Sequence, residues 1–164
     1  MNKRTGNGNI GDESPPKRRR LWRYGPLIFW LAFISFASTA SFSSLNTSTV
    51  IRPLILLVFP HISDARMVVV HFLIRKLAHF TEYAILAFLA RRAFITSSLA
   101  LFRQRWFQSV LVLVVIYALL DEFHQSFVPS RTASIYDSAI DVAGGLTVLL
   151  IFKVYGQWAN NRRS

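Results

Sequence analysis

Residues 106–125 read WFQSVLVLVVIYALLDEFHQ, and this stretch decides the fold. It opens with Trp106, continues without a charged residue to Leu120, and closes with Asp121, Glu122 and His124. A helix of about 20 mostly apolar residues is long enough to cross the ~30 Å hydrocarbon core of a bilayer. The stretch therefore predicts a membrane-spanning helix that has ionisable side chains at one end.

Three other stretches predict similar helices, which makes the expected fold class all-α, an integral membrane bundle of four transmembrane helices. The expected spans are residues 24–42, 67–90, 106–125 and 135–155. The mean hydropathy is +0.36 and 52% of residues are hydrophobic, yet the net charge is +11. The charges stand in blocks between the apolar stretches, as they do in the loops of membrane proteins.

The remaining segments are expected to flank or connect these spans. Residues 1–20 predict a disordered basic cytoplasmic tail, residues 21–155 the four-helix membrane domain, and residues 156–164 a short basic cytoplasmic tail. A cleavable signal peptide is the alternative interpretation of the first span. Residues 43–66 predict a long connection, in which the apolar segment from Pro53 to Phe59 is too short to span and is interfacial or re-entrant.

The distribution of basic residues predicts the topology. With four spans, 14 of the 19 Lys and Arg residues fall on the side of the two termini and five on the other side. Cytoplasmic loops carry the excess of basic residues, so both termini are expected in the cytoplasm.

The composition also excludes several kinds of chemistry. The chain has no Cys, which excludes disulfides, thiolate chemistry and cysteine-based zinc sites. Any metal would need His, Asp, Glu or backbone oxygen ligands. No cofactor and no nucleic-acid partner are expected, because the basic residues mark membrane loops rather than a phosphate-binding stripe.

Ionisable residues of three predicted spans reach the same depth in the membrane. At a rise of ~1.5 Å per residue they lie about 14 to 27 Å above the cytoplasmic anchors. Isolated charges in lipid cost several kcal/mol, so these side chains should face one another in an outward-facing pocket where the last three spans meet. The expected pocket residues are Arg75, Lys76, His79, Glu82, Asp121, Glu122, His124, Gln125, Arg131, Asp137 and Asp141.

Two strings resemble the VanZ-like family of small bacterial membrane proteins. One is RKLAHFTEY, residues 75–83, and the other is DEFHQSFVPSR, residues 121–131, followed by Asp137, Asp141 and the pair Gly144–Gly145. The resemblance covers residues 70–150 and implies a multi-pass protein of the bacterial plasma membrane. It also implies a link to low-level resistance to teicoplanin, a lipid-tailed glycopeptide that acts on the cell wall. It assigns no catalytic residue.

Four interpretations of the polar residues remain open at this point. They can be structural ion pairs that lock helix packing. They can bind the head group of a membrane lipid or a lipid-linked cell-wall precursor, with Arg75, Lys76 and Arg131 on its phosphate. They can hold a metal for phosphoester hydrolysis, because His79-x-x-Glu82 and Asp121-x-x-His124 each place two ligands on one helical face. Finally, they can relay protons or ions.

Overall fold

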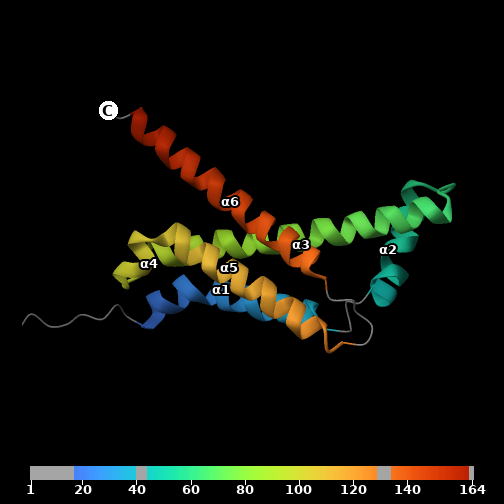
Figure 1. Cartoon of the computed structure of the whole chain (residues 1–164), viewed down its shortest axis with the longest axis horizontal. Helices are drawn as coiled ribbons and strands as arrows, with labels where there is room; N and C mark the ends of the chain where they lie inside the picture. Colours follow the sequence, from blue (N-terminus) through green and yellow to red (C-terminus); the bar gives the residue numbers. More distant parts are fainter. Residues whose placement is uncertain (1–16, 40–43, 129–133, 163–164) are drawn as a thin grey trace, which may run out of the picture.

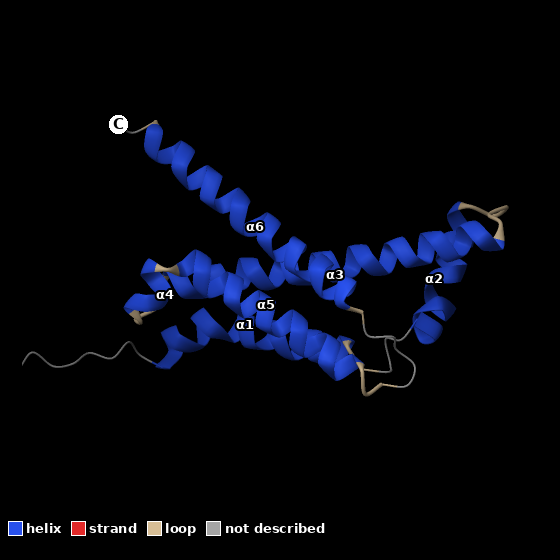
Figure 2. Ribbon diagram, viewed as in Figure 1, coloured by secondary structure: helices blue, strands red, loops and turns tan. Residues whose placement is uncertain are grey.

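The computed structural model describes residues 17–39, 44–128 and 134–162. Within these ranges every regular element is a helix and none is a strand, which confirms the all-α prediction for this part of the chain (Figure 2). The helices are α1 (Lys17–Ala37), α2 (Ser44–Val58), α3 (Asp64–Ile95), α4 (Ala100–Gln104), α5 (Trp106–Gln125) and α6 (Ile135–Asn161).

Two of these helices, α5 and α6, are long and apolar enough to cross a membrane. Helix α1 starts in a basic run, and α3 carries Arg75, Lys76 and Glu82 near its middle. Neither α1 nor α3 therefore holds an uninterrupted apolar stretch of comparable length. The four-span arrangement stays a prediction.

Two helices, α3 and α6, continue past the basic residues at which they were expected to end. Helix α3 runs through Arg91 and Arg92 to Ile95, and α6 continues past Lys153 to Asn161. Arginine and lysine are good helix formers, so a basic residue marks a membrane boundary without stopping the helix. Helix α5 has the expected bounds, and α6 begins at the expected residue.

The N-terminal third differs most from the expected element bounds. Helix α1 starts at Lys17, inside the tail that was expected to be disordered, and ends at Ala37 rather than Phe42. The Thr39 hydroxyl bonds the Phe36 carbonyl over 2.7 Å, and such local bonds compete with helix continuation. The expected connection contains α2 instead, and Pro53 lies inside that helix.

Helices α1, α3 and α5 lie alongside one another, while α6 crosses α3 and its C-terminal half diverges from the bundle (Figure 1). Helix α2 packs beside the first part of α3, at the end of the molecule opposite α4. The last turns of α6 expose Ile151, Val154, Tyr155 and Trp158. An exposed apolar helix face of this kind is typical of contact with lipid or with another helix.

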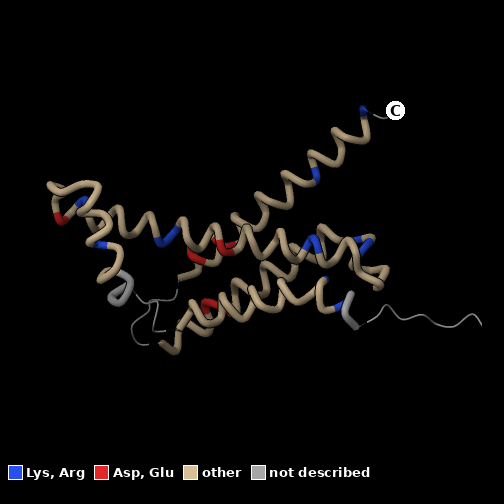
Figure 3. Tube along the Cα trace, turned by 180° about the vertical axis from the view of Figure 1, so that it is seen from behind, with Lys and Arg blue, Asp and Glu red and all other residues tan. Residues whose placement is uncertain are grey.

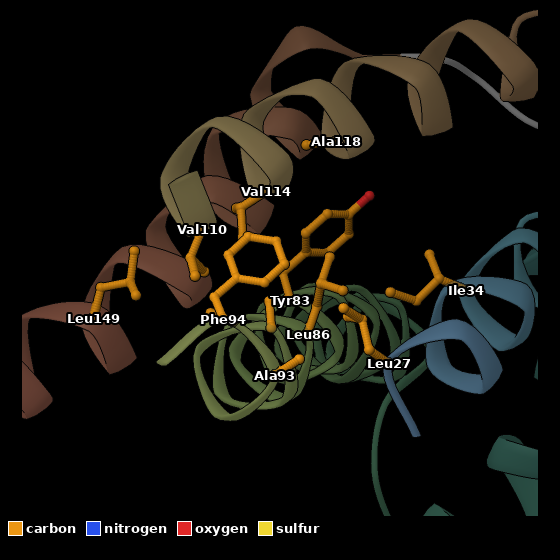
Figure 4. Packing of buried hydrophobic residues seen from close by; sticks show 12 residues of the cluster. Leu27, Ile34, Tyr83, Leu86, Ala93, Phe94, Val110, Val114, Ala118 and Leu149 are labelled. Carbon is orange, nitrogen blue, oxygen red and sulfur yellow. The ribbon is translucent and has the colours of Figure 1, made fainter. Parts of the chain in front are cut away.

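The apolar core lies where α1, α3 and α5 pack together, with a contribution from α6 (Figure 4). Helix α3 supplies most of it and uses small side chains at several positions, which allows its neighbours to approach closely. The buried core residues are Leu27, Ile34, Tyr83, Leu86, Ala87, Ala90, Ala93, Phe94, Val110, Val114, Ala118 and Leu149.

Two adjacent glycines fit α6 between α3 and α5. A Cβ on Gly144 would overlap the backbone carbonyl of Phe80 in α3. A Cβ on Gly145 would come within 2.8 Å of the Val114 side chain in α5. The absence of side chains at these positions therefore sets how closely α6 approaches both helices.

Candidate functional site

Two polar pairs join α3 to α6, each one helical turn from the other. Lys76 Nζ forms an ion pair with Asp137 Oδ1. His79 Nδ1 lies 3.2 Å from Asp141 Oδ1. The spacing of three residues on α3 and four on α6 places both pairs along the same seam between the helices.

Asp121 of α5 is held by hydroxyl and amide donors rather than by a basic residue. Its Oδ1 accepts a hydrogen bond from the Ser38 hydroxyl, just after α1. Its Oδ2 accepts a bond of 2.8 Å from Gln125 Nε2, one turn later on α5. Both donors are almost fully buried, so the Asp121 carboxylate is bonded inside the protein at each oxygen.

The next residue, Glu122, fixes the entry into α6. Its Oε2 accepts a 2.6 Å hydrogen bond from the backbone N–H of Ser134, which precedes the first turn of α6. The Ser138 hydroxyl also bonds the Ala118 carbonyl over 3.3 Å. These bonds tie the end of α5 to the beginning of α6, which brings Asp121 close to Asp141.

Three ligand-type side chains from three helices converge at this level. Single ligand atoms of His79, Asp121 and Asp141 lie within 4.8 Å of one another. Asp141 is fully buried, Asp121 is 6% exposed and Asp137 is 7% exposed. Figure 3 shows that the acidic positions lie away from the end of the molecule that carries α4. We call His79, Asp121 and Asp141 the buried triad.

A cavity of about 330 Å³ reaches one member of the buried triad, Asp121, from the α1 side. It lies between α1 and α5, and Asp121 forms part of its wall. Its other lining residues are Ser35, Thr39, Tyr117, Leu120 and His124. The sequence analysis placed the pocket at the junction of α3, α5 and α6, but Asp141, Gly144 and Gly145 are buried there. The expected pocket at that junction stays a prediction, and the cavity beside α1 is a separate finding.

The other predicted pocket residues lie around this cluster. Arg75 is half-buried one turn before His79 and forms no ion pair with any described residue. Glu82 is half-buried, and its backbone carbonyl accepts a 2.9 Å bond from Trp30 Nε1. His124 is exposed at the cavity. Arg131 lies outside the described residues.

Sequence reasoning missed the contributions of α1 and of two tyrosines. Ser38 bonds Asp121, and no sequence pattern paired these two residues. Tyr117 donates a 2.6 Å hydrogen bond to the Leu31 carbonyl and lies 2.5 Å from the Ser35 hydroxyl. Tyr83 is fully buried one turn after His79. The signal for it was its position in the string at residues 75–83, where polar residues recur at helical spacing.

The fold and the site define an all-helical protein with two helices apolar enough for a membrane and with buried ionisable groups shared among its helices. The model of the VanZ/LLP1 family matches residues 22–156, and the chain belongs to this family. The match starts within α1 and ends within α6, and so extends beyond the two strings that first carried the resemblance. No curated protein matches the chain, and no solved structure matches it.

Proposed function

We propose that the chain is a multi-pass protein of the bacterial plasma membrane that binds the phosphate-bearing head group of a lipid or a lipid-linked cell-wall precursor. The main support for this proposal is a cavity that is lined by both the exposed His124 and the buried Asp121. Ionisable groups are costly inside a membrane, and those beside a cavity are the ones that a polar ligand can reach. A purely structural role does not require such access.

The four spans of this proposal are α1, α3, α5 and α6, with both termini in the cytoplasm. The start of α1, the region of α4 and the end of α6 lie toward the same end of the molecule, as alternating spans require (Figure 1). Most basic residues belong to these segments, which supports a cytoplasmic assignment for that end. Asp121 near the end of α5 and Asp137 near the start of α6 then lie toward the outer face.

The basic residues of the cluster favour an anionic ligand. Lys76 is engaged by Asp137, so it is less available than the sequence analysis expected. Arg75, one turn from His79, has no acidic partner among the described residues. A guanidinium group binds phosphate through two parallel hydrogen bonds, which makes Arg75 the first candidate for the phosphate contact. Arg131 and the cavity residue His124 are further candidates from α5 and the segment that follows it.

Native mass spectrometry of the purified full chain tests this proposal. The probes are a polyprenyl phosphate and a diacyl phosphatidylglycerol, which share the phosphate and differ in the lipid. We expect Arg75→Gln to weaken retention of the preferred lipid about tenfold, which corresponds to about 1.4 kcal/mol. Arg92→Gln is the matched control, because Arg92 is exposed near the opposite end of the same helix. If wild type retains neither lipid, or if Arg75→Gln retains it equally well, the head-group proposal is wrong.

The family's link to teicoplanin extends the proposal to the cell envelope. A protein that binds a lipid-linked wall precursor can alter how a lipid-tailed glycopeptide reaches the same surface. Expression of the wild-type chain is expected to raise the teicoplanin concentration that inhibits growth, and Arg75→Gln is expected to remove this effect. If Arg75→Gln protects against teicoplanin as well as wild type does at equal membrane abundance, any resistance does not depend on the proposed site.

A further inference from the structure

The buried triad has an unusual balance of charge for a site between packed helices. Asp121 and Asp141 are both buried carboxylates, and His79 is the basic side chain that the structure brings into contact with them. Lys76, one turn away on α3, is paired with Asp137 instead. Two carboxylates that share one site disfavour each other's charge, so a further positive species is needed for both to stay ionised.

Two buried oxygens beside the triad have no hydrogen-bond partner among the described residues. One is Oδ2 of Asp141, whose other oxygen contacts His79. The second is the hydroxyl of Tyr83, a residue with no exposed surface. Burying a polar atom without a partner costs about 1–3 kcal/mol. Both atoms are therefore in a position to accept an additional ligand.

The Tyr83 hydroxyl lies on the side of its ring that is turned away from Phe94 and Val114 (Figure 4). Figure 4 shows the hydroxyl pointing out of the cluster of Leu86 and Val114. Tyr83 follows His79 by one turn on α3, the helix that supplies His79 to the triad. Tyr83 thus provides an observation that is independent of the spacing of the triad itself.

We propose that His79, Asp121 and Asp141 bind a divalent transition-metal cation, of the class of Zn²⁺ or Mn²⁺. A dication balances the two carboxylates while His79 stays neutral and coordinates through a ring nitrogen. Two ligands of a tetrahedral zinc site lie about 3.4 Å apart when each metal–ligand bond is about 2.1 Å. His79 Nδ1 and Asp141 Oδ1 are 3.2 Å apart, close to this spacing. Asp121 is the third ligand, and the ligand atoms of all three residues lie within 4.8 Å of one another. Unlike the lipid proposal, this inference requires no phosphate ligand.

The site has one open side. Three protein ligands leave a tetrahedral cation with a fourth position for water or another oxygen donor, as in catalytic zinc sites. Asp121 also lines the cavity of about 330 Å³, which gives one of the three ligands access from the α1 side of the bundle. The Ser38 and Gln125 bonds to Asp121 then act as the outer contacts that orient a metal-binding carboxylate.

Metal analysis of the untagged full chain, purified in detergent, tests the site. The chain is stripped with chelator, incubated with Zn²⁺ or Mn²⁺ alone, and desalted before the bound metal is counted. Wild type is expected to retain about one equivalent of one of these ions, and His79→Ala and Asp141→Asn to retain less than about a tenth of that. Asp64→Asn is the matched control, because Asp64 is an exposed aspartate at the start of α3.

A measurement on wild type alone covers the case in which the triad variants fail to fold. Metal that binds only the folded state raises the unfolding temperature. We expect added Zn²⁺ or Mn²⁺ to raise the unfolding temperature of wild type and of Asp64→Asn, and chelator to reverse the shift. The metal site is wrong if neither ion binds to wild type or raises its unfolding temperature. It is also wrong if folded Asp141→Asn retains the metal fully. Loss of metal from Asp64→Asn as well would mean that the ion binds acidic surface residues non-specifically, and this result would also contradict the triad site.

Discussion

Gly144 of α6 lies directly against the backbone carbonyl of Phe80 in α3, with no room for a Cβ between them. This contact is next to His79 on one helix and one turn after Asp141 on the other. The close approach of the two backbones therefore sets the 3.2 Å separation of His79 Nδ1 and Asp141 Oδ1. The geometry of the polar site depends on the packing of one glycine.

Substitution at Gly144 is predicted to destabilise the protein and open this seam. A Cβ at this position overlaps backbone, which cannot rotate away, so Gly144→Ala is expected to cost about 1–3 kcal/mol. Gly156→Ala, on the same helix, is the control, because a Cβ there meets nothing within 4 Å. Thermal unfolding in detergent compares the two. Equal unfolding temperatures for both variants would contradict the close approach of α6 to α3.

Buried Tyr83 and partly buried Tyr117 are predicted to respond differently to loss of the hydroxyl. Tyr117 bonds the Leu31 carbonyl, so Tyr117→Phe is expected to cost about 1 kcal/mol. The Tyr83 hydroxyl has no protein partner among the described residues, so Tyr83→Phe in chelator is expected to leave stability unchanged or slightly raised. Chemical or thermal unfolding of both variants measures this. A larger loss for Tyr83→Phe than for Tyr117→Phe would mean that the hydroxyl has a protein partner.

The ion pair of Lys76 and Asp137 is predicted to be strongly coupled. Asp137 is buried, so Lys76→Met leaves an uncompensated carboxylate and is expected to cost about 3–5 kcal/mol. The double variant Lys76→Met/Asp137→Leu removes both charges and is expected to recover most of that loss. A double-mutant cycle measured by unfolding gives the coupling free energy.

A surface pair provides the comparison for this cycle. Arg52 and Asp64 are 3.5 Å apart and both side chains are largely exposed. Arg52→Gln is therefore expected to leave the unfolding temperature unchanged. If Lys76→Met also leaves the unfolding temperature unchanged, the ion pair does not stabilise the packing of α6 against α3.

The helices with uniform apolar stretches were predictable from the sequence, and those that depend on tertiary contacts were not. Helix α5 begins where the apolar stretch does, directly after Arg105, and it continues through the polar residues that follow Leu120 to Gln125. The family was also identified from local strings, and the family match confirms it. The bounds of helix α2 were not predicted, because the apolar stretch from Pro53 to Phe59 is too short to span a membrane and indicated only an interfacial or re-entrant segment.

The candidate site was predictable in its residue types but not in its partners. Helical spacing placed His79 and Asp141 on faces that meet. Asp121 and Glu122, however, bond hydroxyl, amide and backbone donors. Ser38 comes from a different helix from Asp121, and no local pattern relates two residues 83 positions apart. The position of the cavity depends on the packing of α1 against α5, which the sequence periodicity does not specify.

The outward orientation of the polar site is tested most directly by cysteine labelling in intact cells. The chain contains no Cys, so single-cysteine variants give unambiguous signals. His61→Cys lies in the exposed turn between α2 and α3, and Ser98→Cys in the exposed turn between α3 and α4. A membrane-impermeant maleimide is predicted to label His61→Cys in intact cells, and Ser98→Cys only after permeabilisation. Labelling of Ser98→Cys but not His61→Cys in intact cells would place the polar site toward the cytoplasm and contradict the account.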